Sequence, residues 1–328
     1  MPNETGILVL TEYVGSQLSG LSMEMLGAAR RLSDQIGGAT VTAVALGSTA
    51  NDAAQQAIAF GADAAVIAPS AELDEYRNDT WTAALSAIAA QVNPAIVLIG
   101  QSNVGRDLAP RYAIRAGTAV AMDTVALEID GGKLAMTRPV YGGSAHARVT
   151  CKTMPSVATV RVKSQERLEP DTGRSGQVST VEVDTASSTA RVVSREEMKA
   201  EGIRLEDAKV VVSGGRGLGS KEGFDDLTTL AELLGGAVGA SRAVVDMGWV
   251  PVNMQVGLTG KVVTPDLYIA VGISGASQHL AGITGAKNVI AINKDKDADI
   301  FKVSRFGAVS DWKPFLPALI AEVRKLKA

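Results

Sequence analysis

The sequence predicts an α/β protein with a parallel sheet in each of two regions. Short apolar runs that suit buried strands alternate with amphipathic helices, and this alternation occurs over residues 6–116 and again after residue 207. Between these regions the pattern changes to that of antiparallel strands. A chain of 328 residues is long enough for two domains. We therefore expect an N-terminal α/β domain at residues 1–195 and a doubly wound C-terminal domain at residues 205–328.

The N-terminal region begins with four strand–helix pairs. Each apolar strand precedes a helix whose apolar residues recur at helical spacing, and Gly37-Gly38 ends the first helix. Short buried strands in such an alternation are typical of a parallel sheet that helices cover on both faces. The predicted strands are Ile7–Leu10, Val41–Leu46, Ala64–Ala68 and 95–99, and the predicted helices are 25–36, 51–60, 80–92 and 106–116.

After residue 116 the sequence indicates antiparallel strands. Asp130-Gly131-Gly132 is a hairpin turn between strands at 125–129 and 133–137. Further strands are expected at 145–152 and 157–162, and we expect this group to form an antiparallel addition to the first sheet. The polar residues 163–178 predict a loop. The domain boundary is expected near 190–206.

The C-terminal region restarts the α/β pattern. Gly235-Gly236 ends its first helix, and a polar loop runs through residues 255–260. Residues 267–273 form a buried strand that leads into a turn of small residues and then a short helix near Gln278. The predicted strands are 208–212, 243–245, 267–273 and 289–292, and the longer predicted helices are 224–234 and 311–326.

Composition excludes several classes of function. A net charge of −3 and an aromatic content of 4% argue against a nucleic-acid partner. Cys151 is the single cysteine, which excludes an intrachain disulfide and a cysteine metal cluster, and we interpret it as a small core residue. With only His146 and His279 present, a histidine metal site is not expected either. We interpret His146 as an ordinary packed or hydrogen-bonded side chain.

The sequence shows no targeting or membrane-spanning segment. The first residues contain no basic stretch followed by an apolar one, and no run approaches the roughly 20 apolar residues of a membrane span. We therefore expect no signal peptide, no membrane insertion and a cytoplasmic location.

Polar or glycine-rich groups mark four successive strand ends in the C-terminal region. In a parallel sheet such ends lie along one edge, which is where ligands bind. Two arginines, several hydroxyls and amides suit a large dinucleotide better than a hydrolytic reaction. The groups are Arg216, Ser241 with Arg242, Ser274 with Gln278 and His279, and Asn293.

A glycine-rich turn, Gly214-Gly-Arg-Gly-Leu-Gly219, lies between a strand and a helix, as in dinucleotide-binding proteins. The pattern is incomplete because Ser220 stands where a dinucleotide fingerprint has its third glycine, and the turn lacks the lysine of a P-loop. It suits either phosphate binding or a tight turn. Asp246 stands where a dehydrogenase holds a ribose, but we favour a turn residue at the end of a strand.

Several strings of the C-terminal region match one known family in order and spacing: 213–218, 241–246, 255–260, and Leu267 to Gly282 followed by Ala-Ile-Asn-Lys-Asp at 291–295. Through them the chain resembles the electron transfer flavoprotein alpha subunit, whose FAD-binding domain carries these strings. The N-terminal string Gly105-Arg-Asp-Leu-Ala-Pro-Arg111 is also similar, but it is less specific.

The resemblance implies a fold and a function. The second domain would be of the FAD/NAD-binding type found in deoxyhypusine synthase, and a beta subunit would complete the flavin site in an obligate heterodimer. The protein would be a redox carrier rather than an enzyme. It would take electrons from flavin dehydrogenases, such as the acyl-CoA dehydrogenases of fatty acid beta-oxidation, to a quinone oxidoreductase. Some members of the family instead bifurcate electrons from NADH with a second FAD. A nicotinamide-dependent dehydrogenase and a regulatory nucleotide-binding module are the alternatives.

The resemblance also implies residues that contact FAD. Arg242 would lie over the isoalloxazine, where positive charge favours reduced flavin, and His279 would donate a hydrogen bond to the flavin O2 side. Arg216 would hold the pyrophosphate or ribose, and Ser241 the phosphate or ring. The residues that would wrap the flavin are Gln255, Val256, Gly257, Leu258 and Thr259, with the Thr259 hydroxyl near N5.

The same resemblance places the rest of the cofactor. Asn293 and Asp311 would contact the adenosine end, and Trp312 also belongs to the expected cofactor-binding set. Asp311 suits the N-cap of the final helix equally well. The residues expected at the phosphate and ribitol are Ser274, Gly275, Ala276, Ser277 and Gln278.

Overall fold

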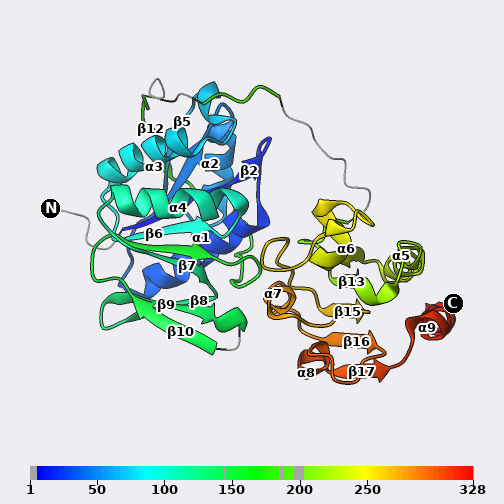
Figure 1. Ribbon diagram of the computed structural model, residues 1–328. Coiled ribbons are helices and arrows are strands. Elements are labelled where there is room, and N and C mark those ends of the chain that lie inside the picture. The colour runs from blue at the N-terminus through cyan, green and yellow to red at the C-terminus, as the bar shows by residue number, and fades with distance from the viewer. Residues whose placement is uncertain (1–5, 144, 185–187, 189, 195–202, 328) are drawn as a thin grey trace. The chain divides into compact units, whose positions relative to one another are not determined.

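The computed structural model describes residues 6–143, 145–184, 188, 190–194 and 203–327 (Figure 1). The chain divides into two compact units, one of residues 1–140 with 145–195 and one of residues 141–144 with 196–328. Part of the predicted domain boundary, residues 195–202, lies outside the described residues. Both units carry a parallel sheet with helices, which confirms the predicted α/β class.

The N-terminal unit contains the four predicted strand–helix pairs. Its elements, with the short turn that the second unit includes, are β1 (Ile7–Leu10), β2 (Tyr13–Val14), β3 (Gln17–Leu18), α1 (Gly20–Gln35), β4 (Val41–Leu46), α2 (Ala50–Ala59), β5 (Ala64–Ala68), η1 (Ala71–Leu73), α3 (Asn78–Val92), β6 (Ile96–Gly100), α4 (Asn103–Arg115), β7 (Val120–Thr124), β8 (Ala126–Asp130), β9 (Lys133–Val140), η2 (Tyr141–Gly143), β10 (Ala145–Thr150), β11 (Ser156–Val160) and β12 (Gln177–Thr180).

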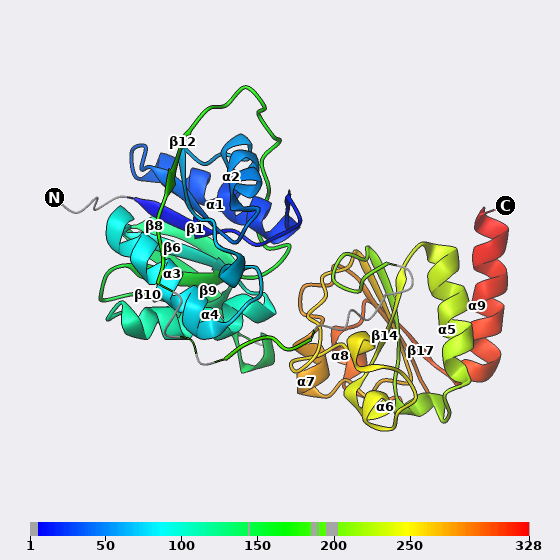
Figure 2. The ribbon, with the colours of Figure 1, turned by 90° about the horizontal axis from the view of Figure 1, so that it is seen from above.

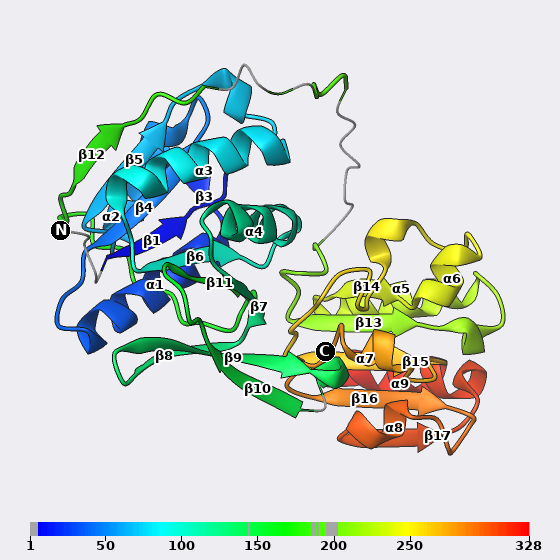
Figure 3. The same ribbon diagram turned by 60° about the vertical axis from the view of Figure 1, so that its left-hand side comes forward.

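The main sheet of this unit is parallel and has the strand order β12-β5-β4-β1-β6-β11-β7. One core cluster joins α1 and α2 to one face of the sheet, and a second joins α3 and α4 to the other face (Figure 3). Because side chains alternate along a strand, β1 contributes Ile7 and Val9 to the first cluster and Leu8 and Leu10 to the second. All four are buried, which explains the continuous apolar run.

The later strands differ from the prediction. The antiparallel strands form a sheet of their own, β10-β9-β8, instead of extending the first sheet, and β11 enters the main sheet parallel to β6 and β7. The last two residues of the predicted loop, 177 and 178, begin β12, which was not predicted and pairs with β5 as an edge strand. An edge strand has one side open to solvent, so it can be polar and still pair with its neighbour. Such a strand lacks the apolar run by which buried strands are recognised in a sequence. Strand β7 was likewise absent from the prediction.

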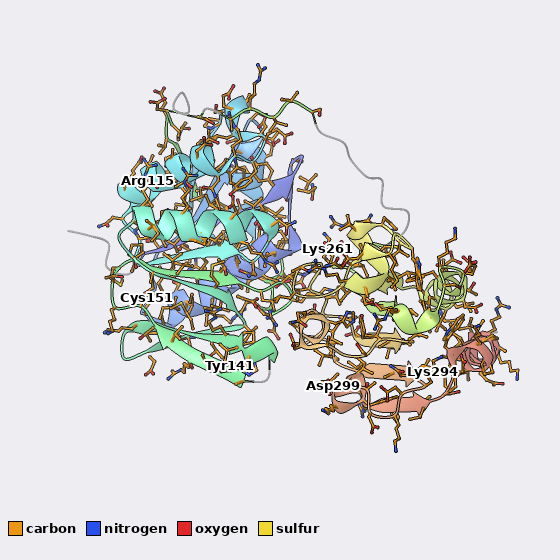
Figure 4. The ribbon with its side chains drawn as sticks, in the orientation of Figure 1. Arg115, Tyr141, Cys151, Lys261, Lys294 and Asp299 are labelled. Carbon is orange, nitrogen blue, oxygen red and sulfur yellow. The ribbon has the colours of Figure 1, made fainter. Side chains whose placement is uncertain are left out.

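Two single residues of this unit can be compared with their expected roles. Cys151 (Figure 4) is partly buried against the first core cluster, with Sγ 3.5 Å from the carbonyl oxygen of Ala119. The interpretation of a small core residue therefore holds in part. His146 is exposed on β10 and is not a packed side chain.

The C-terminal unit is the one that carries the predicted strand ends. Its elements are β13 (Val210–Gly214), η3 (Arg216–Leu218), α5 (Gly223–Leu234), β14 (Ala237–Ala240), α6 (Arg242–Asp246), η4 (Val252–Met254), β15 (Leu267–Val271), α7 (Ser277–Leu280), β16 (Val289–Asn293), α8 (Ile300–Val303), β17 (Phe306–Val309) and α9 (Trp312–Lys327).

The sheet of this unit is parallel, with the order β14-β13-β15-β16-β17. Figure 2 shows α5 and α9 side by side on one face, and α7 and α8 lie on the opposite face. The chain order reverses between β13 and β15, where the connections leave in opposite directions. Ligands of open α/β sheets bind in the crevice at such a point, outside the carboxyl ends of the strands.

One strand of this unit was misplaced by the prediction. Residues 243–245, expected as a strand, belong to helix α6, and the strand is β14, which ends just before Ser241. The two valines of α6 suggested a strand, whereas β14 consists of Ala-Val-Gly-Ala and has little strand propensity. Asp246 consequently ends a helix and not a strand. Helix α8 and strand β17 were not predicted.

Among the described residues, no helix combines the length and the apolar character that crossing a membrane requires.

Candidate functional site

A cavity of about 640 Å³ lies at the carboxyl edge of the C-terminal sheet. Residues that follow β13, β14, β15 and β16 converge on it, together with the loop after η4. Its lining is Arg216, Gly217, Ser241, Arg242, Ala243, Gln255, Val256, Gly257, Leu258, Thr259, Gly272, Ile273, Ser274, Ala276, Gln278, His279, Asn293, Asp295 and Ala298.

The floor of the cavity forms where the loops after β13 and β15 touch through their main chains. The N–H of Gly217 donates to the carbonyl of Gly272 at 2.9 Å, and the N–H of Gly215 donates to that of Val271 at the same distance. A Cβ on Gly217 would lie 2.8 Å from the Cα of Gly272, whose own φ is +64°. Only glycines permit this approach. The glycine-rich turn therefore serves close packing of two strand ends, and Arg216 extends from it to the cavity.

Ser241 and Arg242 enter the site from the end of β14. The N–H of Ser241 donates to the carbonyl of Gly214 at 2.9 Å, and its side chain makes no capping bond to α6, so the hydroxyl is available to a ligand. Arg242 is exposed, and its Nε lies 3.2 Å from the carboxylate of Asp246 one turn along the helix. Asp246 thus pairs with a site arginine and does not occupy a ribose-binding strand end.

The loop from Gln255 to Lys261 is shaped by its own hydrogen bonds. The N–H of Lys261 donates to the Gln255 carbonyl at 2.7 Å, and the N–H of Val256 donates to that of Ala240 at 2.9 Å. Gln255 is buried, and its Nε2 donates to Oγ1 of Thr259 at 3.0 Å. Because this hydroxyl accepts from the amide, its own proton is available for a donation to a ligand.

His279 reaches the cavity from α7 and is only 7% exposed. Its Nε2 lies 2.9 Å from the hydroxyl of Tyr268 in the underlying strand β15. Burial lowers the pKa of His279 to about 4, although the backbone of Val256 opposes this shift. The ring is therefore neutral near pH 7. Its Nδ1 is buried and meets no partner at hydrogen-bonding geometry among the described residues.

The end of β16 closes the site on the side of β17. Nδ2 of Asn293 donates to the carbonyl of Ile273 at 2.9 Å, which ties this strand end to the loop after β15. Asp311 and Trp312 lie at a separate small cavity of about 10 Å³, which Asn293 also lines, along with Lys294 (Figure 4). Oδ1 of Asp311 accepts from the N–H of Lys313 at 3.0 Å, which is the N-cap role that the sequence suggested.

The charge at the cavity is predominantly positive. Arg216 and Arg242 line it, and Asp295 is the one acidic residue among the lining side chains of the described chain. In the described part of the chain, no group of three or more His, Cys, Asp or Glu side chains could hold a metal ion. The site therefore suits an anionic ligand that also offers hydrogen-bond acceptors.

Most residues expected at the cofactor are gathered at this cavity. The exceptions are Gly275 and Ser277, which lie in the adjacent turn, and Asp311 and Trp312 at the smaller cavity. The sequence prediction missed Gly217, Ala243, Gly272, Ile273, Asp295 and Ala298. Five of these residues, Gly217, Ala243, Gly272, Ile273 and Asp295, lie inside the recognised strings, so they carried a usable signal. Ala298 lies outside the strings and carried none.

Two family models match the chain. The electron transfer flavoprotein domain matches residues 7–186, and the electron transfer flavoprotein FAD-binding domain matches residues 204–284. The second match spans the strand ends that form the cavity, except for the end of β16.

Curated relatives match almost the whole length. The electron transfer flavoprotein subunit alpha of Bacillus subtilis is 40% identical over 322 residues, covering 98% of both chains. The protein of the same name from Thermoanaerobacterium thermosaccharolyticum is 41% identical over 325 residues, with 98% of both chains covered. Protein FixB of Clostridium saccharobutylicum is 39% identical over 326 residues, which covers 98% of this chain and 97% of the relative.

Proposed function

Because the chain belongs to the electron transfer flavoprotein alpha-subunit family, with FAD as its cofactor, we propose that it is one subunit of a heterodimeric electron carrier. In this proposal a beta subunit is the partner, flavin dehydrogenases such as acyl-CoA dehydrogenases donate electrons, and a quinone oxidoreductase or similar acceptor receives them. The complex works in the cytoplasm as a redox carrier and does not convert a substrate of its own.

The residues at the cavity fit FAD. The single observation that carries this assignment is that Arg216, Arg242 and the uncapped hydroxyl of Ser241 meet at one cavity. The two arginines suit a pyrophosphate. A volume of about 640 Å³ lies within the roughly 300–1,000 Å³ typical of ligand sites.

We propose roles for the chain's residues in the order of the strand ends. Arg216 and the Ser241 hydroxyl bind the phosphate region, and Arg242 faces the ring system. Thr259 donates its free hydroxyl proton, and neutral His279 contacts the flavin from α7. Asn293 orients the adenosine end. FAD supplies the one-electron and two-electron redox chemistry, and these residues bind it and favour its reduced, more negative form.

The exposed rim of the site supports a partner subunit. Arg242 has 66% of its side chain exposed, Leu258 is 58% exposed, and both line the cavity. A second protein that covers these two side chains would shield the cofactor from water. The beta subunit is the partner that we propose for this surface.

The proposal is tested by co-expression of the chain with its beta partner. We expect a yellow heterodimer with a flavin absorbance spectrum, and denaturation should release FAD in an amount equimolar to the alpha chain. Reduction by an acyl-CoA dehydrogenase with its substrate would then test the donor, and reduction by NADH would test the bifurcating alternative. A colourless heterodimer that releases no flavin would contradict the proposal.

Family membership favours this function over a nicotinamide-dependent dehydrogenase that uses the same sheet edge. The pairing of Asp246 with Arg242 supports the same choice, because a dehydrogenase would use an acidic residue at a strand end for the ribose.

A further inference from the structure

Lys261 ends the loop of residues 255–261, which we call the flavin loop, and does not itself line the cavity. Its N–H donates to the carbonyl of Gln255 at 2.7 Å, and its carbonyl accepts from the N–H of Gly257 at 3.1 Å. Both of these partners line the cavity. The closure is tight, because a Cβ on Gly260 would lie 2.4 Å from the carbonyl oxygen of Gln255. A displacement of Lys261 would therefore reach the cavity through Gln255 and Gly257.

The side chain of Lys261 leaves the flavin loop and binds a distant segment of the same unit. Its Nζ forms an ion pair with Oε1 of Glu206, which lies 55 residues earlier in the chain. The two side chains are 37% and 34% exposed, so the pair is partly shielded from water and salt. Lys261 is also the only charged residue of the flavin loop. The loop can therefore form a side-chain ion pair with the rest of the unit only through this lysine.

Glu206 offers a fixed point to this pair. It belongs to the turn at residues 203–208, which precedes β13 and which we call the entry turn. Leu205 and Ala208 of this turn are buried in the same core cluster as Val256 of the flavin loop. The entry turn and the flavin loop thus share a core, and the ion pair joins them at its edge.

We propose that Lys261 is a positioning residue of the flavin site, whose ion pair with Glu206 holds the end of the flavin loop against the entry turn. Without the pair the loop would adopt its binding shape for a smaller fraction of the time, and the apparent affinity for a ligand falls with that fraction. Because linkage is reciprocal, a ligand that binds the loop also stabilises the entry turn. The inference rests on the proposed function, in which FAD is that ligand.

The affinity is measured on the heterodimer of the alpha chain with its beta subunit, stripped of FAD and titrated with FAD while flavin fluorescence is recorded. Lys261→Met removes the charge and keeps most of the side-chain length. We expect the Kd for FAD to rise about two- to fivefold, the scale of one ion pair near the surface. Lys261→Arg keeps the charge, so its Kd should stay close to that of the wild type. Glu206→Gln should weaken binding as much as Lys261→Met, and the double variant should lose no more than either single variant.

Hydrogen exchange read by mass spectrometry measures the reciprocal effect. FAD should slow the exchange of residues 203–208 in the wild-type heterodimer, and this protection should be lost in Lys261→Met. A lysine that served only the stability of the unit would not make the exchange of the entry turn depend on FAD.

The matched control is Lys287→Met, which removes the lysine of another ion pair of this unit. Its partner is Asp266 at 2.8 Å, and neither residue lines the cavity. Both the Kd and the protection of residues 203–208 should equal those of the wild type.

An unchanged Kd in Lys261→Met, an equal rise in Lys287→Met, or wild-type exchange at residues 203–208 that does not respond to FAD would overturn the inference. If Lys261→Met does not fold, Glu206→Gln and the wild-type exchange decide. A wild-type heterodimer that binds no FAD counts against the proposed function. A heterodimer that binds FAD equally well with and without the ion pair counts only against the role of Lys261.

Discussion

Both units have a parallel sheet with polar groups at the carboxyl ends of its strands. In the N-terminal unit these polar groups hydrogen-bond to one another, whereas in the C-terminal unit several of them do not. At the carboxyl ends of β1 and β6 in the N-terminal unit, Oε1 of Glu12 accepts from the hydroxyl of Ser102 at 2.6 Å. The N–H of Glu12 donates to Ser22, and the hydroxyl of Tyr13 donates to the carbonyl of Leu46. The polar groups of this edge thus bind one another.

At the C-terminal edge the groups are left for a ligand. The Ser241 side chain makes no capping bond, and the Thr259 hydroxyl accepts from Gln255 and keeps its own proton for donation. The N-terminal edge also holds a partly buried acidic side chain, Glu12, whereas two arginines face the C-terminal cavity. A parallel sheet provides the place for a ligand, and the unsatisfied donors and their charge decide whether the place is used.

Among the substitutions that would remove the ligand site of the C-terminal edge, the largest loss of stability is expected at the turn after β15. Gly275 has a φ of +85°, and a Cβ there would lie 2.2 Å from the backbone nitrogen of Ile300. Gly275→Ala should therefore cost about 3 kcal/mol or more of stability and abolish FAD retention. Gly235→Ala is the control, because Gly235 also has a positive φ but meets open space, so only about 1–2 kcal/mol should be lost. Thermal unfolding and flavin content measure both, and equal losses would contradict the steric explanation.

A smaller effect is expected from removing a charge at the cavity. Arg242→Ala should weaken FAD binding about tenfold, the scale of a charge-assisted hydrogen bond. It should also lower the reduction potential of the bound flavin, because a positive charge favours the more negative reduced form. Redox titration measures this shift. Arg305→Ala removes an exposed arginine that does not line the cavity, and its potential should match the wild type. A drop of equal size in both variants would show a general charge effect instead of a site effect.

The smallest effect concerns the pH dependence of the two units, which should have opposite signs. Burial raises the pKa of Glu24 to about 7, so the folded N-terminal unit holds a proton that the unfolded chain has lost, and its stability should fall as the pH rises from about 4.5 to 7. Burial lowers the pKa of His279 to about 4, so the unfolded chain binds the extra proton, and the C-terminal unit should gain stability as the pH rises from about 4 to 6.5.

Hydrogen exchange read by mass spectrometry resolves the two units and checks these slopes. Glu24→Gln should flatten the slope of the N-terminal unit and leave that of the other unit in place. Glu128→Gln is its control, since Glu128 is exposed. Slopes of the same sign in the two units would rule out this assignment.

The sequence predicted those parts of the fold whose signals are local. The continuous apolar run of β1 and the glycine after α5 gave correct bounds, because complete burial and a left-handed cap restrict the residue type. Strand β14 was missed because its residues are small, and the valines of α6 suggested the wrong element. Strand β12 was missed because pairing at an edge between distant segments leaves little trace in composition.

For the site, too, residues with a local sequence signal were predicted and residues whose role depends on distant segments were not. Arg216 and His279, which line the cavity, were expected there because polar residues after apolar strands stand out, whereas Ser241 preceded its predicted strand and was expected from the family string. The buried hydroxyl of Tyr268 was not, since a tyrosine in a strand looks like any core residue until its partner is known. Close approaches such as that of Gly217 to Gly272 depend on two segments that only the fold brings together.

The loop from Gln255 to Lys261 has a consequence for redesign of the flavin's properties. Main-chain hydrogen bonds to Ala240 and Gln278, and three within the loop itself, hold its shape before a ligand arrives. Ordering a free loop would cost about 1–2 kcal/mol per residue, and a loop already held avoids most of that entropy loss on binding. Its shape does not depend on the exposed side chain of Leu258, so a substitution there would change the rim of the site while the main chain of the loop keeps its shape.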